Sequence, residues 1–266
     1  MGILKDLENV CNDIDKDVEK IAATLEKDLD KAKQAVSNGI DKLKSFLVKD
    51  FDDAELALLK GLQSAKLKKY ASEISALQQL AKSGIASADK QSIVNDIESI
   101  IGKADSTAAG AVLSNLVTPT MQQAWPSFRS FRAITLGCDG EIDLIVGVSA
   151  SASAGIYLPS PFDANKARVL IDFLASSGAE EGGDLGLTLG AWVDKPKGVG
   201  GGFIAMTVTG DLFAGAGVIT VFTLALDPKF AGIVIDLEAG EEAELSIDCG
   251  YTLALPVPSG TMIPKS

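Results

Sequence analysis

Two groups of acidic residues have the types and spacing that could do chemistry in this chain. Asp139, Glu141 and Asp143 alternate within one short run, and a second acidic group lies within residues 238–248. A pair of carboxylates can hydrolyse glycosides, and alternating oxygen ligands can bind calcium. Both groups are also typical of solvated strand ends and turns. We favour that interpretation and keep Asp139, Glu141 and Asp143 as a candidate calcium site.

The residues that many enzymes and metal sites use are scarce in this chain. It has no histidine, which excludes Ser-His-Asp triads, Cys-His pairs and imidazole metal ligands. Its three cysteines, Cys11, Cys138 and Cys249, are too widely spaced for a zinc motif. Cys138 and Cys249 lie near opposite ends of a strand-rich region, so a disulfide and two free thiols both stay open. We therefore expect a protein that has no cofactor and is not an enzyme.

The charge of the chain restricts its partners. The net charge is −12, and residues 119–266 hold 17 acidic residues against 8 basic ones. A protein that binds nucleic acid needs a basic face, so we expect no nucleic-acid partner. Charged residues begin at Lys5 and no apolar run of a signal peptide follows. We expect a cytoplasmic protein, with export by a signal-free route as the alternative.

Residues 2–117 show helical periodicity almost throughout. Near the start, apolar residues recur alternately every three and four positions, which is the heptad pattern of a coiled coil. Farther on, apolar residues repeat at eleven-residue steps, so the stripe meets its partner along a nearly straight line, either in one long helix or in two helices separated by a break at Ser37-Asn38-Gly39. Amphipathic helices of this kind form a bundle, bind a copy of themselves or lie on lipid. The predicted interface residues are Leu4, Leu7, Ile14, Val18, Ile21 and Leu25.

Residues 127–256 show a period of two instead, with short runs separated by glycine. Eight or nine such runs predict an antiparallel β-sandwich or barrel. Within residues 141–158 and 184–193, one face is apolar and the other is built mainly from glycine, alanine, serine and threonine. A face of such small residues lets another surface approach closely. That surface would be a neighbouring helix or sheet of the same molecule, or lipid.

The segment 203–226 is the most nearly uncharged part of the strand-rich region, with Asp211 as its single charge. Alternating apolar and small residues predict a β-hairpin. Such a hairpin either lies in the core or leaves it to enter a membrane when copies assemble. The candidate residues for membrane insertion are Phe203, Ile204, Met206, Leu212, Phe213, Val218 and Phe222.

Taken together, these patterns predict an α+β protein with two domains. An N-terminal long-helix bundle or coiled coil, residues 2–117, would be followed by an antiparallel β-sandwich or barrel, residues 127–256. We expect an acidic, homo-oligomeric, non-enzymatic protein that associates with lipid or membranes and can assemble into pores. The first alternative is an oligomeric structural or adhesin-like protein with a helical stalk and a β binding head, and the second is a carboxylate-based hydrolase.

Overall fold

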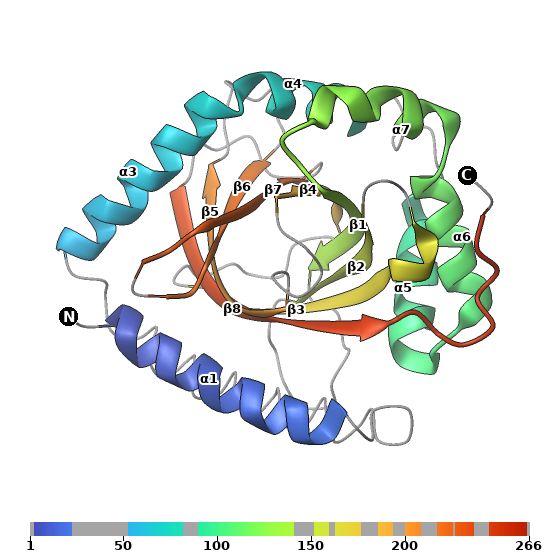
Figure 1. Ribbon diagram of the computed structural model, residues 1–266, viewed down its shortest axis with the longest axis horizontal. Coiled ribbons are helices and arrows are strands. Elements are labelled where there is room, and N and C mark those ends of the chain that lie inside the picture. The colour runs from blue at the N-terminus through green and yellow to red at the C-terminus, as the bar shows by residue number, and fades with distance from the viewer. Residues whose placement is uncertain are drawn as a thin grey trace.

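Strands with alternating large and small side chains curl into a closed antiparallel barrel, seen end-on in Figure 1. The computed structural model describes residues 3–22, 53–81, 90–140, 152–159, 163–176, 186–193, 200–208, 217–225, 227–236 and 245–264. Around the barrel the strands follow the order β1-β2-β3-β8-β5-β6-β7-β4. Their bounds are β1 (Ala133–Gly140), β2 (Ala152–Pro159), β3 (Arg168–Ser176), β4 (Gly186–Trp192), β5 (Gly201–Val208), β6 (Gly217–Thr223), β7 (Phe230–Asp236) and β8 (Leu245–Pro256).

Helices lie around the outside of this barrel. Their bounds are α1 (Ile3–Ala22), α3 (Asp53–Lys69), α4 (Ala71–Leu80), α5 (Lys90–Lys103), α6 (Ser106–Leu116) and α7 (Pro119–Ala124). Two short 3-10 helices, η2 (Trp125–Phe128) and η3 (Ala164–Lys166), join neighbouring elements. In Figure 1, α1 lies below the ring of strands, α4 and α7 above it, and α5 and α6 beside it. The barrel therefore forms the centre of the described structure.

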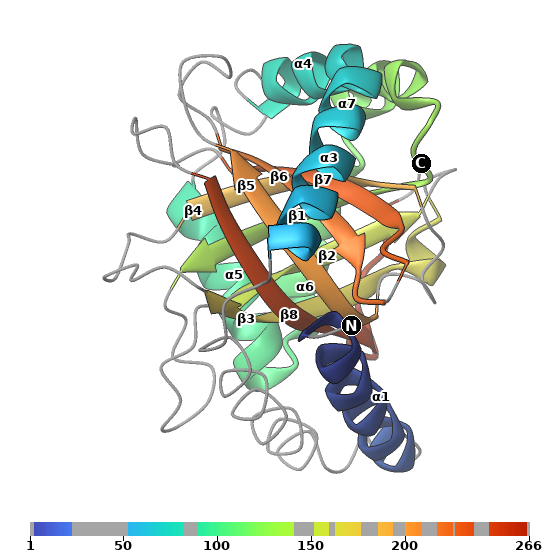
Figure 2. The same cartoon turned by 90° about the vertical axis from the view of Figure 1, so that its left-hand side faces the viewer.

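The outward faces of the strands carry apolar side chains, and the helices bury these side chains. One outer cluster joins strands β1 to β4 and β6 to β8 with helices α4 to α7; its fully or nearly buried members include Ile97, Leu113, Leu116, Ile134, Leu136, Ile156, Leu158, Leu189 and Ile233. A smaller outer cluster lies under α1 and α3; its members include Leu4, Leu7, Cys11, Leu59, Ile204, Met206, Phe222, Cys249 and Tyr251. Figure 2 shows α3 lying outside the strands that it covers.

The predicted long-helix bundle or coiled coil is wrong for the described part of the chain. The helices there are short, and they pack against the barrel instead of forming a stalk. Leu4 and Leu7 from the predicted interface, together with Cys11 on the same stripe, are buried in the smaller outer cluster, against the barrel wall. Gly202 lets α1 lie close to the barrel wall because it has no side chain. A Cβ added there would lie only 2.8 Å from the Cβ of Cys11 and would collide with it.

A heptad stripe therefore docks on a sheet here, because a sheet with an apolar outer face offers the same burial as a partner helix. The side chains of Ile14, Val18, Ile21 and Leu25 lie outside the described part, as does the predicted long straight helix. Their part in self-association stays a prediction. The helices and the strands of the larger outer cluster share one apolar core.

Asp105 provides a local test of the helical packing, because it caps α6. Its Oδ1 accepts hydrogen bonds from the backbone N–H groups of Ala108 (3.2 Å) and Thr107 (2.8 Å), and its Oδ2 accepts one from Ser99 Oγ (3.0 Å). The Ala108 bond, followed by the Ser99 and Thr107 bonds, holds the pKa of Asp105 below its ordinary value of 3.8. A lowered folded-state pKa means that the charged cap stabilises the fold above pH 3.8 and loses this effect as the pH falls through the lowered value.

We expect Asp105→Asn to lower the urea midpoint at pH 7 and to change it much less at pH 2.5. Asparagine is itself a good N-cap, so the difference between the two pH values isolates the carboxylate charge. Glu98→Gln, an exposed change on α5, is the matched loss of one negative charge. An equal effect of Asp105→Asn at both pH values would contradict the role given to the charge.

Candidate functional site

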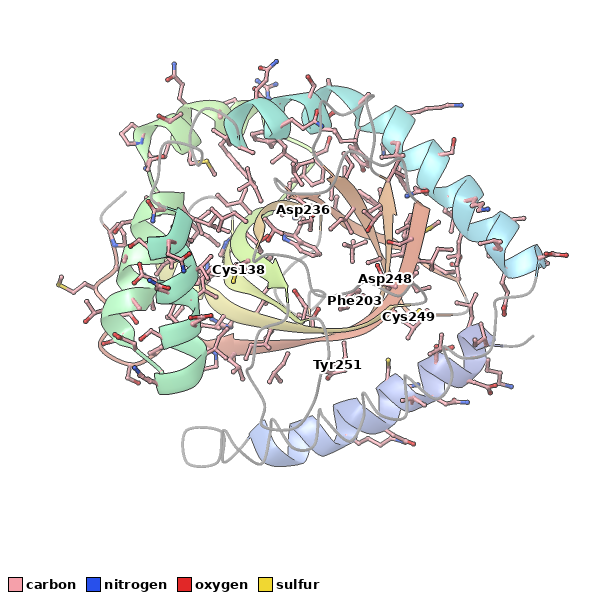
Figure 3. The ribbon with its side chains drawn as sticks, turned by 180° about the vertical axis from the view of Figure 1, so that it is seen from behind. Cys138, Phe203, Asp236, Asp248, Cys249 and Tyr251 are labelled. Carbon is pink, nitrogen blue, oxygen red and sulfur yellow. The ribbon has the colours of Figure 1, made fainter. Side chains whose placement is uncertain are left out.

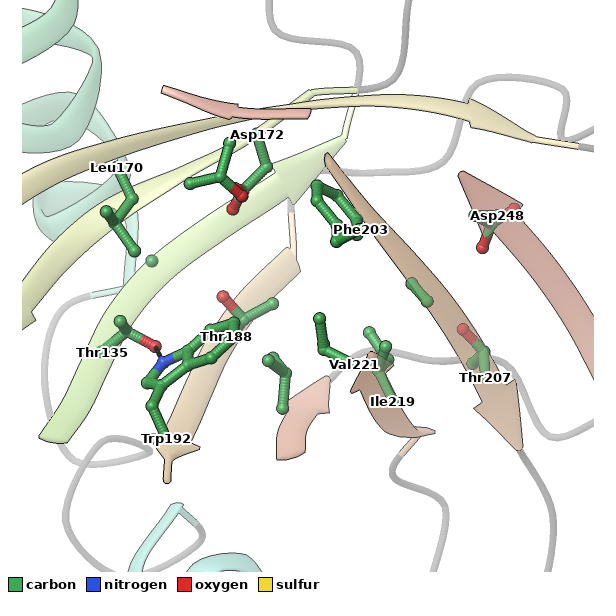
Figure 4. Close-up of a pocket in the computed structure, with 15 residues that line it drawn as sticks. Thr135, Leu170, Asp172, Thr188, Trp192, Phe203, Thr207, Ile219, Val221 and Asp248 are labelled. Atoms are coloured by element: carbon green, nitrogen blue, oxygen red, sulfur yellow. Dashed lines mark hydrogen bonds between the residues drawn. The ribbon is translucent and has the colours of Figure 1, made fainter. Parts of the chain in front are cut away.

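The inward faces of the strands line a partly open cavity of about 100 Å³. An eight-stranded barrel is wide enough for its own side chains or for one small ligand, so small inward residues decide how much space stays empty. Gly137 of β1, Gly155 of β2 and Ala205 of β5 line the cavity, beside larger residues such as Leu170 and Val221. Figure 4 shows the cavity with these strands around it. Of the faces of small residues predicted from the sequence, the described members Gly155 and Thr188 line the barrel.

Trp192, at the end of β4, supplies the largest aromatic surface of the cavity. Its Nε1–H donates a hydrogen bond to Thr135 Oγ1 at 3.0 Å, which fixes the indole against β1. Glycines on either side make room for the ring. A Cβ at Gly190 would lie 2.9 Å from Nε1, and a Cβ at Gly232 would lie 2.7 Å from Cε3. The glycines of β4 and β7 thus hold one wall of the cavity in a defined place.

Two carboxylates also line the cavity, Asp172 on β3 and Asp248 on β8. Asp172 Oδ1 accepts a hydrogen bond from Thr252 Oγ1 at 2.5 Å, across the β3–β8 pair. Asp248 Oδ2 accepts a longer hydrogen bond from Ser246 Oγ at 3.3 Å. In Figure 4, Phe203 lies between the two carboxylates, and Trp192 lies on the opposite side of the view. The described cavity lining holds no lysine or arginine.

The remainder of the lining is apolar or hydroxylic. Phe203, Ile219, Val221 and Val234 present apolar side chains, and four threonines present hydroxyl groups. The arrangement has the general composition of a small-molecule site, which is mainly apolar with a few polar groups that orient the ligand. Its described lining holds neither histidine nor lysine, and its one close hydroxyl–carboxylate contact is the hydrogen bond from Thr252 to Asp172.

The structure places the candidate membrane-insertion residues in different surroundings. Phe203 lines the cavity. Ile204, Met206 and Phe222 lie in the smaller outer cluster under α1 and α3, and Val218 lies in the larger outer cluster. Leu212 and Phe213 lie outside the described residues. In the described state the hairpin is part of the barrel wall, and its insertion into a membrane stays a prediction.

The candidate calcium site lies mostly outside the described residues. Asp139 belongs to the end of β1, and Glu141 and Asp143 fall beyond the described part of the chain. Within the described part, no group of three or more cysteine or acidic residues could hold a metal ion. Calcium binding at Asp139, Glu141 and Asp143 therefore stays a prediction.

The three cysteines are buried on the outer side of the barrel wall, and none of them is in a disulfide. Cys138 belongs to the larger outer cluster, whereas Cys249 and Cys11 belong to the smaller one. Cys138 and Cys249 thus lie in separate regions and do not form the disulfide that the sequence left open. Burial, and after it the nearby charge of Asp248, raises the pKa of Cys249 well above its ordinary value. Figure 3 shows Cys249 and Tyr251 on the side of the strands that faces α1.

Sequence reasoning missed Asp172 and misjudged Asp248. Asp248 was interpreted as part of a solvated turn, but it is half-buried and lines the cavity. Asp172 interrupts the apolar run of β3, on the same face as Leu170, and a lone charge inside an apolar strand was the available signal. Trp192 carries no local sequence signal that gives it a role in the site. Its place in the lining depends on the pairing of β4 with β1 and β7.

Comparison with known proteins adds no relative: no family model, curated protein or solved structure matches this chain. In the described part of the chain, no helix combines the length and the apolar character needed to cross a membrane.

Proposed function

We propose that this protein is a non-enzymatic binding protein that holds a small, largely apolar molecule inside its barrel. The observation that carries the proposal is the cavity of about 100 Å³ among the inward residues of a barrel whose outer face is already covered by helices. Apolar cavities of about 150 Å³ can bind benzene, so the space in this cavity suits a ligand of about the size of benzene or smaller, and a larger ligand would reach its open side.

The position of the cavity favours a role in binding a ligand over a role as the apolar core of the fold. The outer clusters contain the large aliphatic side chains, which already supply apolar cores. The inner cluster is smaller, and it combines aromatic residues with alanines, including Trp192, Phe203, Ala205 and Ala231. Aromatic side chains that border empty space lack van der Waals contacts on that side, and a ligand would supply these contacts. A ligand would therefore stabilise the folded barrel.

The test uses three probes of nearly equal shape: toluene, benzyl alcohol and benzylamine. Trp125→Phe leaves Trp192 as the single tryptophan, and its fluorescence reports events inside the barrel. We expect at least one probe to change this fluorescence saturably and to raise the melting temperature. If none of the three probes does so, the binding proposal is wrong.

A cavity-filling variant locates the binding. We expect Ala205→Phe to reduce probe affinity by at least tenfold, because Ala205 is buried in the inner cluster and lines the cavity. Ala111→Phe, on the exposed face of α6, is the matched control and should bind as the parent does. Overpacking can destabilise a core by about 1–3 kcal/mol, so the melting temperature is measured for both variants and Val221→Phe is a second filling variant. Probe binding that survives both filling variants would place the site elsewhere.

Association with lipid is a second proposal, favoured by how α1 covers the barrel. The helix contacts the wall through apolar residues near its start, including Ile3, Leu4, Leu7 and Val10. Its undocking would expose those residues together with Cys249 and Tyr251, and an exposed apolar patch of this kind binds other apolar surfaces. Flotation with liposomes tests this proposal: cofractionation of the parent with neutral vesicles supports it, and its absence from neutral and anionic vesicles alike rejects it.

A further inference from the structure

The Thr188 hydroxyl group is the part of the cavity lining that indicates which kind of ligand fits. Four threonines of the described chain line the cavity, and the hydroxyl groups of Thr135 and Thr252 form hydrogen bonds with other lining residues. Thr188 of β4 is only 9% exposed, and its hydroxyl group has no hydrogen-bond partner among the described residues. A buried hydroxyl group without a partner is unfavourable, and a ligand in the cavity can supply that partner.

Glycine next to Thr188 leaves its side chain open to the cavity. Thr188 and Trp192 share the inward face of β4, because side chains alternate along a strand. Thr188 is paired with Gly137 of β1, which also lines the cavity and has no side chain that could cover the hydroxyl group. Figure 4 shows Thr188 next to the Trp192 ring, with Phe203 across the cavity. A ligand ring that packs on Trp192 thus brings its substituent within reach of Thr188.

We propose that the ligand is a small neutral aromatic molecule with a carbonyl oxygen, such as an aromatic aldehyde. This inference rests on the proposed function, because it names the class of ligand for the same cavity. The carbonyl oxygen accepts a hydrogen bond from the Thr188 hydroxyl group, and the ring packs against Trp192 and Phe203. Aromatic rings favour offset or edge-on contacts with one another, and the Trp192 indole is already held in place by its bond to Thr135.

A carbonyl group fits Thr188 better than a charged group does. A threonine hydroxyl has one hydrogen to donate, and a carbonyl oxygen accepts it without adding a donor that needs a further partner. A protonated amine has three donors and no acceptor, so it would leave the Thr188 hydrogen without a partner. A carboxylate could accept that hydrogen, but Asp172 and Asp248 belong to the lining, where like charges repel.

The experiment compares benzaldehyde with styrene, which has nearly the same planar shape but a CH₂ group in place of the oxygen. Both are slightly larger than benzene, and the partly open cavity leaves room for the substituent. Isothermal titration calorimetry measures the affinity of each probe for the parent and for Thr188→Val, which replaces the hydroxyl group with a methyl group. We expect Thr188→Val to weaken benzaldehyde binding by about three- to tenfold, the range for one hydrogen bond, and not to weaken styrene binding. Reversible reaction of benzaldehyde with surface lysines is equal in both proteins and cancels.

Controls separate the role of the Thr188 hydroxyl group from folding and from other sites. Thr107→Val removes an exposed hydroxyl group on α6 and should leave both affinities unchanged. Styrene binding and the melting temperature report whether Thr188→Val is folded. Equal weakening of both probes, or a loss of benzaldehyde affinity in Thr207→Val and not in Thr188→Val, would overturn the inference. If Ala205→Phe blocks styrene but Thr188→Val binds benzaldehyde as the parent does, the carbonyl inference fails while the binding function stands. If neither probe binds the parent, the inference fails as well.

Discussion

Replacing Phe222 with alanine is expected to lower the free energy of unfolding by about 3–5 kcal/mol, the range for deleting a buried aromatic ring. Phe222 is fully buried on the outer face of β6, in the smaller outer cluster with Leu7 and Leu59. Its ring also meets Phe230 edge-on, with centroids 5.9 Å apart. The surrounding barrel wall and helices limit how far the structure can collapse into the space. Urea unfolding monitored by circular dichroism measures the loss.

Leu58→Ala is the control for Phe222→Ala. Leu58 lies on α3 near the same region, but 46% of it is exposed, so its removal should change stability little. Phe222→Leu should fall between the two because it retains part of the apolar contact. The result also bears on the hairpin 203–226, whose residues on β5 and β6 are core in this structure. Unchanged stability in Phe222→Ala would show that this face is not covered as described.

The pattern of alternating residues predicted the strands but could not show which face would be inside the barrel. In an ordinary half-exposed sheet, the larger apolar residues face the core and small or polar residues face water. Here both faces are enclosed. Leu136 and Ile156 face outward and are buried by helices, whereas Gly137 and Gly155 face the narrow interior. Whether the face of small residues lies inside or outside depends on closure of the barrel, and no local sequence pattern predicts that closure.

The candidate site shows the same limit at the level of single residues. Asp172 can be noticed in the sequence as a charge within an apolar strand, and Asp248 as one of several acids before an apolar strand. Nothing local says that both face one cavity. Their placement follows from the pairing of β3 with β8, two strands that are far apart in sequence and adjacent in the barrel. The strand order had to be known before the charges could be combined into a site.

The periodicity of the helical half predicted which residues form an apolar stripe, but the predicted partner of that stripe was wrong: it packs on the barrel and not on another helix. Spacings of three and four residues put Leu4, Leu7 and Cys11 on one stripe, and the structure buries all three. A stripe of this kind does not specify what covers it. A second helix and the outer wall of a barrel both bury it, and only the location of the wall decides between them. One substitution in this stripe separates docking from self-association.

Leu7→Asp is expected to lower the free energy of unfolding by about 3–5 kcal/mol, because it puts an unpaired charge where Leu7 is fully buried. The molar mass measured by light scattering should stay that of the parent, since the contact that is lost lies within one chain. Asn9→Asp adds the same charge on the exposed face of α1 and should leave both quantities unchanged. A lower mass at unchanged stability would favour the coiled-coil seam over docking on the barrel.

Where the loss occurs can be measured as well, because α1 packs on the outside of the barrel and its local detachment differs from global unfolding in hydrogen exchange. If the helix detaches locally, the loss of stability is limited to what its docking contributes. Amide hydrogen exchange should then accelerate in α1 and at Cys249 and Tyr251, which it covers, while β1 and β4 keep their protection. Acceleration throughout the barrel would instead show that α1 is part of the cooperative core. Protection of α1 equal to that of the parent would contradict its docking through Leu7.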